Sequence, residues 1–359
     1  MVIRKRIFVA AISVLSVLWL LFLVSNFSST SWNEIFSSFG GQRSYENSEE
    51  LTGITNIWTP KQPLEVFTEI AQSSPEIPGP EMLSNGYPDV LILSPLKQVS
   101  GHIKSYFTLL HSLSYPKNSI SLGFLVSDSD DRSYDLVRDH FLQRKKVVTN
   151  QTEKYRDVTL VHQSFSYNPG SNWVDIHGMR NQIPRRKVLA KSRNYLLFSS
   201  LRPHHEWVLW IDSDVSHYPP TMVQDLLNFT GPDKHILVPN SYWRDDKGEE
   251  HPYDRNSWRE TPESRKFLKQ TQEIVVFEGY SAYTTGRISL GDLRGSNESV
   301  VKLDAVGGTV LLVRGRLHRE GLVFLPVPYE KAIETEALGK LALGMGYQPW
   351  GLPNYITIH

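Results

Sequence analysis

From residue 89 onward, short apolar runs alternate with longer amphipathic stretches. The apolar runs predict strands and the amphipathic stretches predict helices. Strands are expected over residues 90–93, 122–126, 158–162, 207–211 and 236–239, and helices over residues 102–113, 134–144 and 185–201. Such alternation gives an α/β fold, in which helices cover both faces of a mainly parallel sheet and ligands bind at the carboxyl ends of the strands.

After residue 242 the pattern changes to a charged loop and a less regular region. Apolar stretches there predict strands over residues 273–277 and 308–313, and a helix over residues 330–343. The sequence contains no internal repeat and no Gly-rich phosphate loop of the lysine type. Its length suffices for one large domain, which we expect over residues 87–359.

The composition excludes several kinds of partner and site. The 38 basic residues balance 38 acidic ones, so no overall field favours nucleic acid or an anionic surface. The chain has no cysteine, which removes disulfides, thiolate catalysis and thiolate zinc sites. A metal would therefore be held by oxygen and imidazole ligands, a set that suits Mg²⁺ or Mn²⁺.

The N-terminal segment predicts a membrane anchor. Basic residues 4–6 precede an uncharged run over residues 7–24 that is long enough to span a bilayer. A cleavable signal peptide is the alternative, although its apolar region would be shorter. Positive charge before the span keeps residues 1–6 in the cytosol and sends the rest into the secretory lumen, a type II topology. Residues 25–86, rich in serine and proline, are expected to form a stem.

Four segments match the acceptor pattern for N-linked glycosylation. They begin at Asn26, Asn150, Asn228 and Asn297. The pattern agrees with a lumenal domain but is also common by chance, so it adds little weight.

An Asp-Ser-Asp triplet follows the predicted strand at residues 207–211. The carboxylates of Asp212 and Asp214 can share one divalent cation at the end of that strand. Such a cation neutralises the charge that builds up on a diphosphate leaving group. A second triplet, residues 128–130, also follows a predicted strand, so spacing alone does not identify the site. We assign the metal to Asp212 and Asp214 because they follow the fourth strand, deep in the domain.

An apolar strand followed by Asp-x-Asp also resembles the nucleophile motif of haloacid-dehalogenase-type phosphatases. Those enzymes carry the motif on the first strand of the fold and bind Mg²⁺ with a later acidic pair. Here three predicted strands precede the triplet, and Gly291-Asp292 lacks a second aspartate at the expected spacing. A phosphatase is therefore the remote alternative.

The predicted helix at residues 185–201 brings Arg186, Lys187, Lys191, Arg193 and Asn194 within about two turns, and Lys187, Lys191 and Asn194 share one side of it. Such a face can bind phosphates, and it can equally be a solvated surface. Its place directly before the strand of the Asp212 triplet favours phosphate binding.

Three features near the C-terminal end allow two interpretations each. The segment DAVGGT starts at Asp304, and its glycines permit either close approach to a sugar or a tight bulge. Glu334 opens the last predicted helix, as a cap or as a carboxylate of the site. His359 is either structural or a metal ligand.

Ordered blocks between residues 89 and 359 resemble the fungal mannan polymerase mannosyltransferases, the Anp/Mnn/Van group. The blocks are VLILSPLK, NWVDIHGMRNQIPRRKVLAKSRNYLL, WVLWIDSDV, EGYS, DAVGGTVLLVR and IETEALGKLALGMGYQPWGLPNYITIH. Together they are far more specific than the Asp-x-Asp triplet. The chain departs from the group in its basic helix, which is usually richer in arginine than AKSRN.

The resemblance implies a Rossmann-like glycosyltransferase fold of the GT-A type, with GDP-mannose as donor and Mn²⁺, or Mg²⁺, as metal. It implies retention of configuration in an α-1,6 mannosyl linkage to a mannose-containing N-glycan outer chain. It also implies that His359 completes a metal site with Asp212 and Asp214.

The resemblance also implies roles for further residues. Nucleotide contacts are expected from Ser94, Pro95, Asp128, Lys191, Arg193 and Asn194. Catalytic roles are expected for Asp304 and Glu334, beside the two metal-binding aspartates. The domain then divides into a nucleotide-binding half at residues 87–240 and an acceptor half at residues 241–359.

The resemblance places the chain in the Golgi membrane, in a complex with homologous mannan polymerase subunits. Within such a complex it is either an active mannosyltransferase or a weakly active scaffold subunit. The intact Asp212 and Asp214 favour an active enzyme.

Overall fold

A computed structural model describes residues 65–67, 86–167, 178–280 and 284–359 of the chain. Within these ranges, every helix is too short or too polar to cross a bilayer. The predicted anchor at residues 7–24, Asn26 and most of the predicted stem lie outside them.

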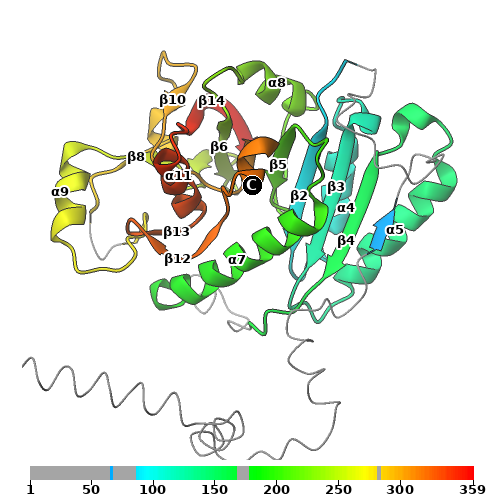
Figure 1. Ribbon diagram of the computed structural model, residues 1–359, viewed down its shortest axis with the longest axis horizontal. Helices are drawn as coiled ribbons and strands as arrows, with labels where there is room; N and C mark the ends of the chain where they lie inside the picture. The colour runs from blue at the N-terminus through cyan, green and yellow to red at the C-terminus, as the bar shows by residue number, and fades with distance from the viewer. Residues whose placement is uncertain (1–64, 68–85, 168–177, 281–283) are drawn as a thin grey trace, which may run out of the picture. The chain divides into compact units, whose positions relative to one another are not determined.

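A ten-stranded sheet forms the centre of the described domain (Figure 1). Its order is β1-β4-β3-β2-β5-β11-β6-β14-β10, with β7 paired to β6. The strands that run in one direction are β2 (Val90–Leu96), β3 (Ile120–Val126), β4 (Asp157–His162), β5 (Trp207–Ile211), β6 (Ile236–Arg244) and β14 (Trp350–Ile358). The opposite strands are β1 (Glu65–Phe67), β7 (Glu250–Pro252), β10 (Val301–Lys302) and β11 (Val310–Arg314). The fold is thus mixed α/β with a mostly parallel sheet, as predicted.

Helices cover the sheet on both faces, because its central strands are apolar on both sides. Val90 and Ile92 of β2 belong to the core that contains α4 (Ile103–His111), α5 (Ser133–Val147) and α8 (Met222–Phe229). Leu91 and Leu93 belong to the opposite core, with α7 (Met179–Ser200), α10 (Gly315–Arg319) and α11 (Thr335–Gly344). The long α7 lies across the front of the sheet in Figure 1.

Smaller elements complete the domain. They are α9 (Pro262–Gln270), the paired strands β8 (Trp258–Arg259) and β9 (Ile288–Ser289), the paired strands β12 (Leu325–Tyr329) and β13 (Ala332–Glu334), and three 3₁₀ turns, η1 (Lys117–Ser119), η2 (Gln151–Glu153) and η3 (Gly291–Leu293).

The first five predicted strands are confirmed, and so is the strand predicted over residues 308–313, which is β11. Two other predictions for the second half of the chain differ from the structure. The predicted strand at residues 273–277 is wrong: Val275 and Phe277 are buried against Ile333 without strand pairing. The last helix begins at Thr335 because the preceding residues form β13.

The sequence analysis missed β14, which contains a glycine and a proline that are typical of turns. The strand accommodates Pro353 where its register against β6 shifts, between Leu352 and Ile356. It then continues to Ile358 and carries His359 to the carboxyl end of the sheet.

Candidate functional site

A cavity of about 770 Å³ lies at the carboxyl ends of β2, β3, β4 and β5. Its lining comes from the loops after these strands and from one side of α7. The lining residues are Pro95, Leu96, Lys97, Gln98, Ser127, Asp128, Ser129, Asp130, Ser166, Tyr167, Arg185, Val188, Leu189, Ser192, Arg193, Asp212, Ser213 and Asp214. This is the edge of the sheet at which a parallel α/β fold binds ligands.

Arg193 of α7 fixes Asp212 at the floor of the cavity. Its Nη2 donates to Asp212 Oδ1 at 3.0 Å, and its Nε donates to Glu334 Oε1 at 2.9 Å. The guanidinium also lies over the rings of Trp210 and Phe324. Among the described residues, Arg193 Nη1 has no hydrogen-bond partner. Arg193 is therefore rigidly placed and keeps one donor free.

Asp214 lies beside His359, which β14 brings from the far end of the sequence. His359 Nε2 and Asp214 Oδ2 are 3.0 Å apart, an ion-pair distance without hydrogen-bond geometry. The ring of His359 stacks on Tyr253, with centroids 3.6 Å apart. Its backbone N–H donates to the carbonyl of Tyr242 at 2.7 Å, so the residue is held in place.

The two aspartates differ in their electrostatics. Burial first, and then the carboxylates of Asp214 and Glu334, raise the pKa of Asp212 against the opposing effect of Arg193. Burial alone would raise the pKa of Asp214, but its contacts with His359 and with backbone N–H groups outweigh burial and lower it. A pair in which one carboxylate is ionised and the other resists ionisation suits a site that gains a positive charge.

The donor atoms fit a hard divalent cation. Arg193 uses one oxygen of Asp212, and His359 faces one oxygen of Asp214, so each carboxylate keeps a second oxygen. Carboxylate and imidazole donors suit Mn²⁺. The ligand atoms of Asp212, Asp214 and His359 do not, however, all lie within 4.8 Å of one another.

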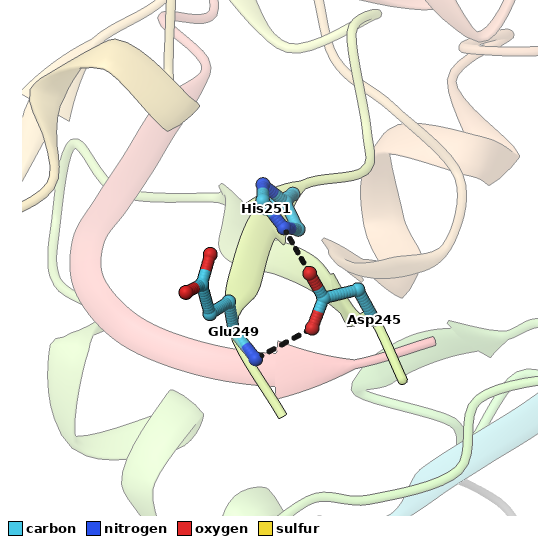
Figure 2. Close-up of side chains that lie close together, drawn as sticks. All are labelled: Asp245, Glu249 and His251. Atoms are coloured by element: carbon cyan, nitrogen blue, oxygen red, sulfur yellow. Dashed lines mark hydrogen bonds and ion pairs between the residues drawn. The ribbon is translucent and has the colours of Figure 1, made fainter. Parts of the chain in front are cut away.

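Within the described residues, one group does meet that distance: Asp245, Glu249 and His251 in the β6–β7 hairpin. Figure 2 shows that Asp245 accepts from the backbone N–H of Glu249 and faces His251. Asp245 Oδ1 also accepts from the backbone N–H of Lys247. These contacts shape the turn of the hairpin and explain the cluster without a metal.

The second Asp-Ser-Asp triplet has a structural role. Asp128 Oδ1 accepts from the Ser164 hydroxyl at 2.6 Å and from the backbone N–H groups of Phe165 and Ser166, both at 3.0 Å. Asp130 accepts from the Gln98 side chain at 2.8 Å. Asp128 lines the cavity as predicted, but its carboxylate joins two loops and is saturated.

Only some of the residues predicted to contact the nucleotide line the cavity. Pro95 and Arg193 line the cavity. Ser94 is fully buried and bonded to the Tyr106 hydroxyl, because it points to the core side of β2. Lys191 is exposed away from the cavity, and Asn194 pairs with both backbone groups of Phe324. A helix turns about 100° per residue, so Lys191 and Asn194 point to other sides of α7 than Arg193 and lie outside the cavity lining.

The two predicted catalytic carboxylates are hydrogen-bonded to other groups of the chain. Asp304 Oδ2 accepts the backbone N–H of Glu260 at 2.7 Å. Glu334 is buried, pairs with Arg193 and accepts from the Thr335 hydroxyl at 3.1 Å. Glu334 has a φ of 60°, a strained backbone for a residue with a side chain. Glu334 thus supports the site through Arg193, and Asp304 orders a neighbouring loop.

The glycines at 307 and 308 are required by close packing against charged side chains. A Cβ on Gly307 would lie 1.4 Å from Asp254 Oδ2, and one on Gly308 would lie 2.7 Å from Arg193 Nη2. Packing within the domain therefore accounts for both glycines.

Sequence analysis missed several residues of the site. Arg185 and Ser192 line the cavity from α7, and Tyr253 supports His359. Arg185 was within reach of sequence reasoning, since it lies two turns before Arg193 on the same helix face. Nothing in the sequence pointed to Tyr253, because the pairing of β6 with β7 and β14 places it.

Residues 79–328 match the Anp1 family model. The chain belongs to the Anp1 family. This member is 38% identical to the mannan polymerase II complex anp1 subunit of Schizosaccharomyces pombe over 277 residues, 75% of the chain and 63% of the relative. It is 36% identical to the ANP1 subunit of Saccharomyces cerevisiae, covering 75% of the chain and 54% of that relative. The mannan polymerase complex subunit MNN9 of Candida albicans is 32% identical, with 76% and 74% covered.

The chain therefore spans between half and two thirds of the first two relatives. Among solved structures, the mannosyltransferase PcManGT from Pyrobaculum calidifontis in complex with GDP-Man and Mn²⁺ is 13% identical, with a TM-score of 0.44 over 83% of this Anp1-family chain and 60% of its own. Residues 1–349 of TarS from S. aureus are 14% identical, with a TM-score of 0.38 over 76% and 58%. Likenesses this weak carry no functional argument.

Proposed function

We propose that this chain is a retaining GT-A-type mannosyltransferase that moves mannose from GDP-mannose to the 6-hydroxyl of an α-mannoside. The observation that carries the proposal is a cavity of about 770 Å³ lined by Asp212 and Asp214, with His359 beside Asp214. That volume is in the range of small-molecule and cofactor sites. The names of relatives, which are subunits of mannan polymerase complexes, support mannose as the sugar.

In this proposal Asp212, Asp214 and His359 hold Mn²⁺, with Mg²⁺ as a substitute. When bound, the cation supplies positive charge to the diphosphate leaving group. The chain adds the guanidinium groups of Arg185 and Arg193, two residues of α7 that line the same cavity. Guanidinium groups suit phosphate oxygens because their donors form a planar fork.

Retention allows two mechanisms. A double displacement needs a free carboxylate nucleophile beneath the anomeric carbon, whereas same-face attack uses the leaving phosphate as base. Asp304 and Glu334, the predicted catalytic carboxylates, are both hydrogen-bonded to other groups. We favour same-face attack for this reason.

We place the enzyme in the Golgi membrane as a type II protein with a lumenal catalytic domain, in complex with homologous subunits. The basic and apolar character of residues 4–24 supports the anchor. The names of the relatives, which are subunits of mannan polymerase complexes, support the assembly. They also favour a second candidate function, a weakly active scaffold subunit.

The test is Mn²⁺-dependent hydrolysis of GDP-mannose, and transfer to mannobiose, by the full chain. We expect Asp214→Ala to reduce turnover by at least 100-fold, the scale of losing a residue that acts at the reacting charge. Phe198→Ala, an exposed change on α7, is the matched control. Turnover that survives Asp214→Ala would refute the site, and turnover that appears only with a homologous subunit would favour the scaffold.

A further inference from the structure

The β6–β7 hairpin carries an aromatic face that extends beyond the proposed catalytic corner. Trp243 pairs with His251 across the two strands, and their rings lie 4.9 Å apart. Tyr253 follows two residues after His251, so its side chain points to the same face of the hairpin. Trp243, His251 and Tyr253, called here the aromatic face, thus form a row.

The opposite face of the hairpin is buried against the chain. Tyr242 donates to the carbonyl of Gly291 at 2.9 Å and lies under the guanidinium of Arg294. A Cβ on Gly291 would lie 2.6 Å from Pro252 Cβ, which shows how closely the two segments pack. These contacts hold the opposite face of the hairpin against the chain, and the aromatic face lies on the other side.

The aromatic face is exposed although its members are large rings. Trp243 is 41% exposed and Tyr253 is 38% exposed. The side chain of His251 is 41% exposed. Isolated exposed aromatics need no explanation, but a row of three on a rigid hairpin is a surface available to a ligand.

The row is continuous with the catalytic corner. Tyr253 stacks on His359 with an interplanar angle of 14°, and His359 lies 3.0 Å from Asp214. A ligand that extends away from Asp214 along the hairpin would pass Tyr253 first and Trp243 last. The exposed rings thus lie along one path from the reacting position.

The chemistry of the row suits an oligosaccharide. A pyranose ring has C–H groups on its faces and hydroxyl groups around its edge, so it stacks on an aromatic ring and hydrogen-bonds sideways. Polar partners border the row: Asp245 lies 3.3 Å from His251, and Glu249 is adjacent (Figure 2). Charged groups at the border of the row disfavour an apolar helix or a lipid surface as the occupant.

We propose that the aromatic face binds the acceptor oligosaccharide, with Tyr253 near the acceptor sugar and Trp243 under a sugar farther along the chain. This inference rests on the proposed function, since it extends the same site. It makes the enzyme sensitive to acceptor length: a longer mannoside gains a contact at Trp243 that a short one cannot reach.

The experiment measures the rate of mannose transfer to methyl α-mannoside, to mannobiose and to a mannohexaose. Each rate is divided by the rate at which the same variant hydrolyses GDP-mannose. We expect Trp243→Ala to lower this ratio about tenfold for mannohexaose, the equivalent of one lost stacking contact. The ratio for methyl α-mannoside should stay unchanged. Trp243→Phe should recover most of the loss, and Phe198→Ala should match the wild type.

The inference is overturned if Trp243→Ala lowers the ratio of transfer to hydrolysis equally for all three acceptors, or lowers it for none. Calorimetric titration with mannohexaose tests binding without turnover. Weaker binding by Trp243→Ala supports the aromatic face, and equal binding refutes it. Failure of the proposed function has a different signature, which is absence of Mn²⁺-dependent donor hydrolysis in the wild type.

Discussion

Arg193 is the residue on which the site depends, because it joins Asp212 to Glu334 while its own side chain is 5% exposed. Lysine at this position keeps the charge but cannot donate in two directions from a planar group. We expect Arg193→Lys to lower the free energy of unfolding by about 2 kcal/mol, the scale of hydrogen bonds between charged groups. Urea denaturation measures this loss, and GDP-mannose hydrolysis should fall by at least tenfold.

Lys191 provides the matched control two residues away. It is exposed on the same helix and lies outside the cavity lining. We expect Lys191→Ala to change the free energy of unfolding by less than about 0.5 kcal/mol, as is usual for surface sites. Weaker binding of GDP-mannose by Lys191→Ala would instead show that Lys191 contacts the phosphates, as the basic face of the helix predicts.

At the scale of elements, the segment before β11 packs directly against the buried carboxylate of Asp254. Gly307→Ala would force a Cβ to within 1.4 Å of Asp254 Oδ2, so the segment has to move. We expect a loss of about 3 kcal/mol, at the upper end of overpacking effects, measured by thermal or urea unfolding. Gly231→Ala is the control, because its nearest neighbour would lie 3.8 Å away.

Helices α4 and α5 meet through two histidines that the site does not use. His111 Nε2 and His140 Nε2 are 2.8 Å apart, and His111 Nδ1 lies 2.8 Å from the Tyr155 hydroxyl. Burial, followed by the charges of Arg144, His140 and Lys117, lowers the pKa of His111 to about 3. Burial and then Arg144 lower the pKa of His140 to about 4. Both rings therefore stay neutral in the folded chain.

Unfolded histidines take up protons near pH 6.5, whereas these two take them up only near pH 3 to 4 in the fold. Between those values the unfolded chain binds more protons, so stability falls as pH falls from about 6.5. We expect His140→Phe to flatten the slope of unfolding free energy against pH between 6.5 and 4.5. His217→Gln, a change at an exposed histidine, should keep the wild-type slope. An unchanged slope in His140→Phe would contradict the assignment.

At the scale of the whole molecule, three of the four glycosylation acceptor patterns lie on the described surface. Asn150, Asn228 and Asn297 are exposed. Asn150 Oδ1 accepts from the backbone N–H and the hydroxyl of Thr152, so Nδ2, the atom that would carry a glycan, takes no part in these bonds. Asn150 precedes β4 and Asn228 precedes β6. Both therefore lie toward the amino ends of the strands, whereas the cavity lies at their carboxyl ends.

If the domain is lumenal, glycans at Asn150 and Asn228 would be tolerated without blocking the site. We expect endoglycosidase to increase the gel mobility of the chain isolated from cells, and Asn150→Gln to remove one step of that shift. Turnover should be unchanged in Asn150→Gln. A chain without any shift would count against the lumenal topology.

The sequence by itself determined the layered α/β architecture, the first five strands and the position of Asp212 and Asp214 at a strand end. These features follow from local patterns, since apolar periodicity and turn residues act over a few positions. The ordered motif blocks also indicated the family, which the match over residues 79–328 confirms.

The tertiary structure alone decided which of the polar residues meet. Two identical Asp-Ser-Asp triplets follow similar strands, yet Asp128 is saturated by loop N–H groups, whereas Asp212 and Asp214 face Arg193 and His359. His359 arrives through β14, a strand with a turn-like sequence that pairs with β6 on one side and β10 on the other. Contacts between residues more than a hundred positions apart depend on strand order and register, which local sequence does not encode.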